Sequence, residues 1–228
     1  MRMKSIFRHE TILFLVVIVA LVILSIQAEQ FATIDNLLNQ GRFLTEVSLV
    51  ALIMTFVIVT GGIDLSVGSI LGLSAIVLGV AWKKLGLPLP LAILVALSVG
   101  TLAGLFNGII ITRFKVPPLI ATLATLALYR GLAEGISQAR SIRGYPEWFF
   151  VLGQGEFFGI PTQLWIVAFF TLLTGFILTY TTWGRATYAI GANETAARFS
   201  GIAVDKTKLF IYAASGFAAS LAALIFVS

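Results

Sequence analysis

Uncharged apolar runs recur along the whole chain and are separated by short polar stretches. A transmembrane helix needs about 20 predominantly apolar residues. On this measure the runs predict about seven spans, at roughly 11–28, 43–60, 69–82, 89–111, 116–137, 163–182 and 208–227. The third is short unless it is tilted, broken or borrows residues from the glycine-rich stretch before it. The pattern predicts an all-α, polytopic transmembrane bundle that forms one domain over residues 1–228.

The composition agrees with a helical membrane protein. Hydrophobic residues make up 59% of the chain and charged residues 11%, against about 25% charged in an average soluble domain. A transmembrane barrel would instead show short segments of alternating polarity. The chain has no cysteine and one histidine, His9, which argues against a disulfide framework, a thiol catalyst or a metal site built from these residues.

The basic residues lie near the ends of the predicted spans, where they report orientation. A cytoplasmic N-terminus places nine of them inside and five outside; the inner ones are Arg2, Lys4, Arg8, Arg113, Lys115, Arg185, Arg198, Lys206 and Lys208, and the outer ones are Arg42, Lys83, Lys84, Arg140 and Arg143. This asymmetry predicts a cytoplasmic N-terminus. The chain then ends outside, directly after an apolar helix, so we interpret it as a fragment of a longer protein.

The stretch Gly61–Gly68 interrupts the apolar pattern with a single acid, Asp64, between two uncharged runs. A carboxylate near hydrocarbon is costly and normally faces a cavity or a partner group, and glycines let the backbone turn or unwind. One interpretation is a broken segment beside a translocation path. The other is a tight cytoplasmic turn in which Asp64 caps the following helix.

A few other polar residues lie within the spans. Arg130 and Glu134 are four residues apart, which favours a pair on one helix face over a substrate site. Asn107, Thr122 and Thr125 can bind hydroxyl groups of a solute or merely neighbouring helices. Glycines at four-residue spacing, such as Gly100, Gly104 and Gly108, allow helices to approach closely.

A second informative stretch lies in the predicted cytoplasmic loop 184–207. Asn193 is a good helix cap, Glu194 suits a first helical turn and Gly201 suits a helix end. The pattern predicts about two turns of helix between Gly191 and Gly201. Such a helix either docks into a groove on a partner or is a plain connector.

The sequence gives little support for catalysis. It has no Ser/His/Asp set, no metal-ligand cluster and no glycine-rich loop with a lysine for phosphate. If the chain is a transporter, its energy must come from an ion gradient or from another subunit.

Three stretches together resemble the membrane-spanning permeases of ABC importers for monosaccharides, a group that includes the ribose, rhamnose and autoinducer importers. They are the motif Gly61–Ser69, the motif Pro117–Thr125 followed by Leu128-Tyr-Arg-Gly131, and the loop 184–201. The resemblance implies that this loop contains the coupling helix that docks onto an ATP-binding subunit. Its coupling residues would be Gly191, Asn193, Glu194, Ala196, Ala197 and Gly201, although Thr195 interrupts the family's Glu-Ala-Ala pattern.

The resemblance also implies partners and a location. It implies a multi-pass protein of the bacterial inner membrane that works with cytoplasmic ATP-binding subunits, a second identical or homologous permease, and a periplasmic or lipid-anchored sugar-binding protein. No cofactor is expected in this chain, because the partner subunit uses the ATP. Membrane lipid surrounds the chain, and no nucleic-acid partner is expected. Members of the family are longer, so the chain covers about the first two-thirds.

The resulting prediction is a permease subunit, not an enzyme, that moves a monosaccharide or a similar polyhydroxylated solute. The loop 144–149 most resembles that of rhamnose-type permeases, which implies a rhamnose-type substrate. The expected substrate path contains Asp64, Ser66, Asn107, Thr122, Thr125 and Arg130, and no metal. The alternatives are a gradient-driven secondary carrier, or a non-functional truncated permease or scaffold.

Overall fold

The computed structural model describes residues 9–138 and 140–228, and the chain divides between Phe43 and Leu44 into two compact units. The first unit contains α1 (His9–Gln27) and α2 (Ile34–Phe43). Three basic residues used in the orientation argument, Arg2, Lys4 and Arg8, lie outside the described residues. The second unit contains every other element and is described by itself below.

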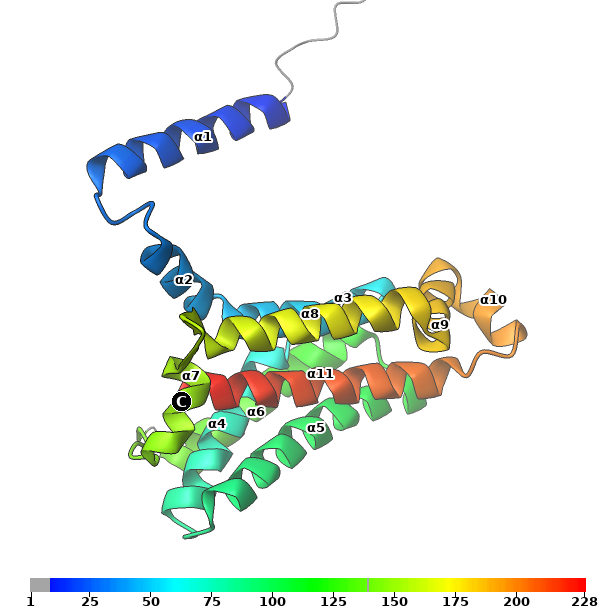
Figure 1. Cartoon of the computed structure of the whole chain (residues 1–228). Coiled ribbons are helices and arrows are strands. Elements are labelled where there is room, and N and C mark those ends of the chain that lie inside the picture. Colours follow the sequence, from blue (N-terminus) through cyan, green and yellow to red (C-terminus); the bar gives the residue numbers. More distant parts are fainter. Residues whose placement is uncertain (1–8, 139) are drawn as a thin grey trace, which may run out of the picture. The chain divides into compact units, whose positions relative to one another are not determined.

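The second unit is built from helices joined by short connections (Figure 1). The elements are α3 (Thr45–Val59), α4 (Val67–Lys83), α5 (Leu89–Arg113), α6 (Pro118–Ser137), the 3-10 helix η1 (Glu147–Phe150), α7 (Val151–Gln154), β1 (Glu156–Phe157), β2 (Ile160–Pro161), α8 (Thr162–Tyr180), α9 (Thr182–Ala192), α10 (Glu194–Phe199) and α11 (Val204–Val227). The two strands form one antiparallel hairpin. Prolines open α5 and α6, where a missing N–H is tolerated.

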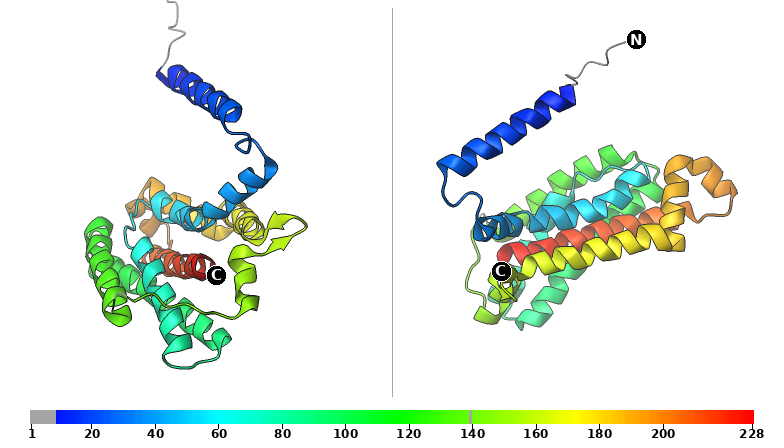
Figure 2. Two further views of the ribbon diagram at one scale, coloured as in Figure 1. Left: turned by 90° about the vertical axis from the view of Figure 1, so that its left-hand side faces the viewer. Right: turned by 45° about the horizontal axis from the view of Figure 1, so that its top comes forward.

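The last helix, α11, lies in the middle of this unit. It packs against α3, α4 and α5, and the left panel of Figure 2 looks nearly along it. Of the four long apolar helices it is the most deeply buried, and α8 is the most exposed. Helix α4 in turn packs against α5 and α6. The core is therefore organised around α11.

Helices α5 and α11 cross with their backbones in close contact. A Cβ atom built on Gly104 would lie 2.8 Å from the backbone nitrogen of Gly216, and one on Gly216 would lie 2.8 Å from the nitrogen of Gly104. Gly100 faces Ser220 in the same contact. The predicted close-packing role of the α5 glycines is confirmed. By contrast, Cβ atoms at Gly68, Gly72, Gly131 and Gly135 would meet no other atom of the described chain within 4 Å.

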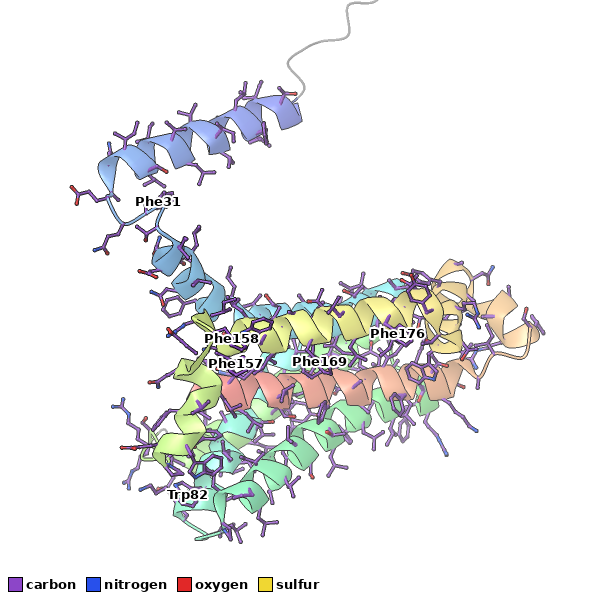
Figure 3. All side chains as sticks on the ribbon, in the orientation of Figure 1. Phe31, Trp82, Phe157, Phe158, Phe169 and Phe176 are labelled. Atoms are coloured by element: carbon purple, nitrogen blue, oxygen red, sulfur yellow. The ribbon has the colours of Figure 1, made fainter. Side chains whose placement is uncertain are left out.

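The outer face of α8 carries apolar side chains. Phe169 and Phe176 point away from the ribbon in Figure 3, and both are more than half exposed. A hollow of about 720 Å³ between α3, α8 and α11 is also lined mostly by apolar side chains. Exposed apolar helix faces are expected where lipid is the solvent.

The helices agree with the predicted runs, and the helical fold class is confirmed. Four helices are long and apolar enough to cross a membrane, namely α5, α6, α8 and α11, with a fifth span if α2 and α3 are taken together. The shorter helices include α4 and the stretch Thr11–Gln27 of α1. The count of seven spans stays a prediction.

Candidate functional site

The glycine-rich stretch is a non-helical link inside the bundle. Helix α3 ends at Val59 and α4 begins at Val67. Asp64, within the link, is 2% exposed and contacts Ser215, which lies near the middle of the 24-residue helix α11. The structure thus contains the unwound segment of the first interpretation rather than a surface turn. Unwound backbone at such depth is tolerated where it is buried in protein.

The carboxylate of Asp64 has partners at both oxygens. Its Oδ1 accepts hydrogen bonds from the backbone N–H of Ser66 at 2.9 Å and from the hydroxyl of Ser66 at 2.6 Å. Its Oδ2 accepts from the hydroxyl of Ser215 at 3.0 Å. The Nδ2 of Asn107 donates to the Ser66 hydroxyl at 2.7 Å. Buried polar groups stabilise a fold when they are mutually satisfied in this way.

Further hydroxyl groups extend these contacts. The hydroxyls of Thr122 and Tyr212 donate to the backbone carbonyl of Ile63 at 3.3 and 3.4 Å. The hydroxyl of Tyr129 lies 3.4 Å from Oδ1 of Asn107. We call this set the Asp64 network; it consists of Asp64, Ser66, Asn107, Thr122, Tyr129, Tyr212 and Ser215. It joins the link to α5, α6 and α11. The sequence did not single out Tyr129, Tyr212 or Ser215.

The remaining predicted path residues lie on α6. The Thr125 hydroxyl bonds to backbone carbonyls of its own helix. Arg130 is exposed and pairs with Glu134 at 3.0 Å, so the predicted helix-face pair is confirmed. Both border a groove of about 590 Å³ between α4 and α6, which we call the α4–α6 groove. Its lining includes Leu65, Gly68, Ser69, Gly72, Arg130 and Glu134. Of the six predicted path residues, Arg130 is the one that borders it.

The second candidate site is α10. At its start the Oδ1 of Asn193 accepts from the backbone N–H of Ala196 at 2.9 Å. At its end Gly201 has a φ of +82°, and the N–H groups of Gly201 and Ile202 donate to the carbonyls of Arg198 and Ala197. This is the Schellman arrangement, which favours glycine at that position. The predicted short helix and both of its caps are confirmed.

Helix α10 has an inner and an outer face. On the inner face Ala197 is buried against Ile190 and Val204, and the neighbouring Gly191 lies against the backbone carbonyl of Val59. On the outer face Ala196 is exposed and Phe199 is 89% exposed. The sequence analysis did not single out Phe199. The feature that could have indicated it is its position as a lone aromatic residue in an alanine-rich, polar loop.

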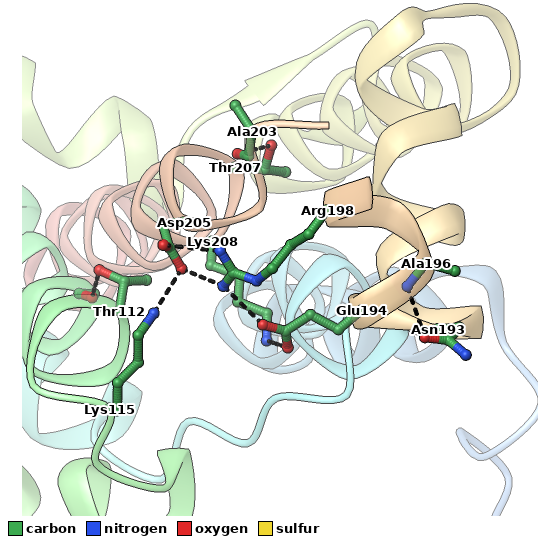
Figure 4. Close-up of polar contacts among 11 residues, drawn as sticks. Thr112, Lys115, Asn193, Glu194, Ala196, Arg198, Ala203, Asp205, Thr207 and Lys208 are labelled. Carbon is green, nitrogen blue, oxygen red and sulfur yellow. Dashed lines mark hydrogen bonds and ion pairs between the residues drawn. The ribbon is translucent and has the colours of Figure 1, made fainter. Parts of the chain in front are cut away.

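The inner face also carries charges that are tied to the bundle (Figure 4). The guanidinium of Arg198 donates to Oε1 of Glu194 at 2.9 Å and to both oxygens of Asp205, at 2.5 and 3.0 Å. Lys208 donates to Oε2 of Glu194 at 2.5 Å, and Lys115 to Oδ1 of Asp205 at 3.1 Å. We call these five residues the α10 clasp. The spacing of Glu194 and Arg198 was its only local signal.

The clasp keeps Glu194 ionised. Its hydrogen bond from Lys208, together with that from Arg198, holds the pKa of the Glu194 carboxyl below its ordinary value of 4.5. Because the pKa of Glu194 is lower in the folded state, the stability that its pairing contributes is fully present above the ordinary pKa. That contribution is lost as the pH falls through the folded-state pKa. At neutral pH the Glu194 carboxyl is therefore ionised. Among the described residues, no three His, Cys, Asp or Glu side chains gather where a metal could bind.

Comparison with known proteins gives the family. Residues 34–228 match the family described as branched-chain amino acid transport system / permease component. The ribose import permease protein RbsC of Haemophilus influenzae is 39% identical over 219 residues, which cover 94% of this chain and 68% of that protein. The L-arabinose transport system permease protein AraH of Escherichia coli is 35% identical over 206 residues, which cover 87% of this chain and 60% of that protein.

A third relative has the same character. The autoinducer 2 import system permease protein LsrC of an Enterobacter species is 38% identical over 180 residues, which cover 79% of this chain and 52% of that protein. No solved structure matches the chain. These matches confirm the resemblance seen in the sequence and place the protein among multi-pass transport components rather than enzymes. The chain belongs to the branched-chain amino acid transport system / permease component family.

Proposed function

We propose that the chain is the permease subunit of an ATP-binding-cassette importer for a monosaccharide or a similar polyhydroxylated solute. The chain is 35–39% identical to the ribose import permease and the L-arabinose transport system permease, and this similarity is the main support for the function. The capped, protruding α10 supports it, because such an importer must contact an ATPase. The relatives' names give no support to the rhamnose-type preference, and the sugar is left unassigned.

The proposal includes the partners and the orientation. Cytoplasmic ATP-binding subunits would dock on α10, a second identical or homologous permease would complete the pore, and a sugar-binding protein would deliver the solute from outside. The N-terminus would be cytoplasmic. The cluster of charges around α10, drawn from Lys115, Arg198, Asp205 and Lys208, suits an end of the bundle that lies in water.

We place the substrate path along the α4–α6 groove. Ser69 and the Arg130–Glu134 pair offer polar groups there, and Gly68 and Gly72 leave room beside them. Leu65 of this lining is the chain neighbour of both Asp64 and Ser66, and the Asp64 network would form the fixed wall of this path. The charged groups of this groove are few and are paired with each other, which suits a neutral solute that carries hydroxyl groups.

Energy dependence separates this function from a gradient-driven carrier. We expect uptake by cells that contain the complete importer to stop when ATP is depleted and to continue when an ionophore collapses the ion gradients while ATP is maintained. The reason is that the driving force would come from the ATP-binding subunit. Uptake that survives ATP depletion and stops with the ionophore would support the secondary carrier instead.

The outer face of α10 gives a second prediction. The Phe199→Ser change should weaken binding of the ATP-binding subunit by about 30-fold, because a buried aromatic anchor at an interface contributes about 2 kcal/mol or more. Co-purification of the two subunits from membranes measures this. Phe158→Ser is the matched control, since Phe158 is 85% exposed but lies in the β-hairpin, away from α10 (Figure 3). Equal recovery of the ATPase with both variants would contradict docking through α10.

A further inference from the structure

We propose that the α10 clasp is the element that transmits movement of α10 to the bundle, and that Lys115, Glu194, Arg198, Asp205 and Lys208 are positioning residues for coupling. The inference rests on the proposed function, since it assigns a role within an ATPase-driven permease. It differs from docking: the clasp lies on the inner face of α10, whereas the docking surface lies on the outer face. Loss of the clasp should therefore separate ATP hydrolysis from transport without releasing the ATPase.

Apart from the clasp, few side-chain contacts hold α10 in place. The helix has six residues, and Ala197 is its one buried residue. Individual exposed ion pairs contribute little to stability, but linked ones with a planar guanidinium fix geometry. Arg198 bonds to two carboxylates at once, on Glu194 and Asp205. The clasp therefore sets the orientation of α10 rather than the stability of the bundle.

The clasp joins three separate elements of the chain. Glu194 and Arg198 belong to α10, Asp205 and Lys208 to the first turns of α11, and Lys115 to the connection between α5 and α6. Lys115 has a φ of +56°, a conformation that is unfavourable for a residue with a side chain. Its ion pair with Asp205 ties this connection to α11. A displacement of α10 thus acts on α11 and on the start of α6 together.

Helices α6 and α11, which the clasp links, also meet in the interior at the Asp64 network. Helix α11 contributes Ser215 and Tyr212 to the Asp64 network, and α6 contributes Thr122. Helix α6 also carries Arg130 beside the α4–α6 groove. Packed helices that are linked at two levels move as units rather than bending freely. The clasp therefore connects α10 to the helices that border the proposed path.

The test uses the complete importer reconstituted in lipid vesicles with its partner subunits. Arg198→Gln removes the centre of the clasp, and Lys206→Gln is the matched control, because Lys206 is an exposed neighbour of Asp205 and is outside the clasp. We expect Arg198→Gln to keep the ATPase bound and hydrolysing ATP but to raise the ATP consumed per solute moved by about fivefold or more, in line with usual coupling energies. Arg198→Lys should restore part of the coupling, because it keeps the charge but not the fork.

A second readout reports orientation directly. The chain has no cysteine, so a spin label on Thr195→Cys reports on the outer face of α10 alone. We expect the label to be more mobile in the Arg198→Gln background than in the Lys206→Gln background. A coupling ratio and a label mobility that are the same in both backgrounds would overturn the role of the clasp. Loss of the ATPase from Arg198→Gln complexes would also overturn it, and would assign Arg198 to the docking surface instead.

These outcomes are distinct from failure of the proposed function. If α10 does not dock, Phe199→Ser leaves the ATPase bound. If the ATPase docks but the clasp does not transmit, Phe199→Ser releases the ATPase and Arg198→Gln leaves the coupling ratio unchanged.

Discussion

The Gly104→Leu change is expected to prevent the second unit from reaching its folded state in the membrane. A side chain at Gly104 points into the backbone of α11, with the nitrogen and Cα of Gly216 at 2.8 and 2.9 Å from its Cβ and the carbonyl oxygen of Tyr212 closer still. Backbone cannot rotate away as a side chain can, so α5 and α11 must separate. Overpacking within a core costs about 1–3 kcal/mol even where side chains can shift, and the cost here should exceed that range.

The matched control is Gly131→Ala on α6, where the added Cβ meets no described atom within 4 Å. That change should be neutral or stabilising by about 0.5–1 kcal/mol, because alanine favours helix over glycine. Thermal unfolding in detergent, followed by size-exclusion chromatography, measures both variants. If Gly104→Leu elutes as a single folded species with the melting temperature of the control, the α5–α11 crossing is not as close as the structure has it.

The Asp64→Ala change should destabilise the second unit by about 3 kcal/mol. It removes the acceptor for the Ser66 hydroxyl and backbone N–H and for the Ser215 hydroxyl, and buried donors left without a partner cost about 1–3 kcal/mol each. The cost falls on all the helices that the Asp64 network joins. Thermal unfolding of the purified chain in detergent measures it.

Glu134→Ala is the control for Asp64→Ala, because both changes remove a carboxylate that has a hydrogen-bonding partner. The partner of Glu134 is Arg130, one turn away on the same helix. Its ion pair with Arg130 is exposed, so its loss should cost less than about 1 kcal/mol. Equal melting temperatures for the two variants would show that Asp64 does not hold the network together.

Much of the helical architecture could be predicted from the sequence, because hydropathy and caps are local signals. The apolar runs predicted the central parts of six helices of the second unit, namely α3, α4, α5, α6, α8 and α11. Asn193 and Gly201 gave the ends of α10, since both act on backbone groups within a few residues. The pair Arg130–Glu134 was equally predictable from its spacing.

The partners of these groups could not be predicted in the same way. Ser215 is 151 residues from Asp64, Asn107 is 41 residues from Ser66 and Lys115 is 90 residues from Asp205. Such contacts depend on which helix faces meet. The glycines at four-residue spacing also cannot be told apart in the sequence, because their spacing does not show which of them face another helix. In the structure Gly104 packs against the backbone of α11, whereas a Cβ atom on Gly131 would meet no atom of another described element within 4 Å.

Cross-linking at α10 shows whether an ATP-binding subunit docks on its outer face. Thr195→Cys supplies a unique thiol in a chain without cysteine, on the exposed face of α10. The account predicts that a short thiol-to-amine cross-linker joins this position to an ATP-binding subunit in native membranes, while a thiol at Phe158→Cys gives no such product. Active import without any ATP-binding protein cross-linked at Thr195→Cys would contradict the account.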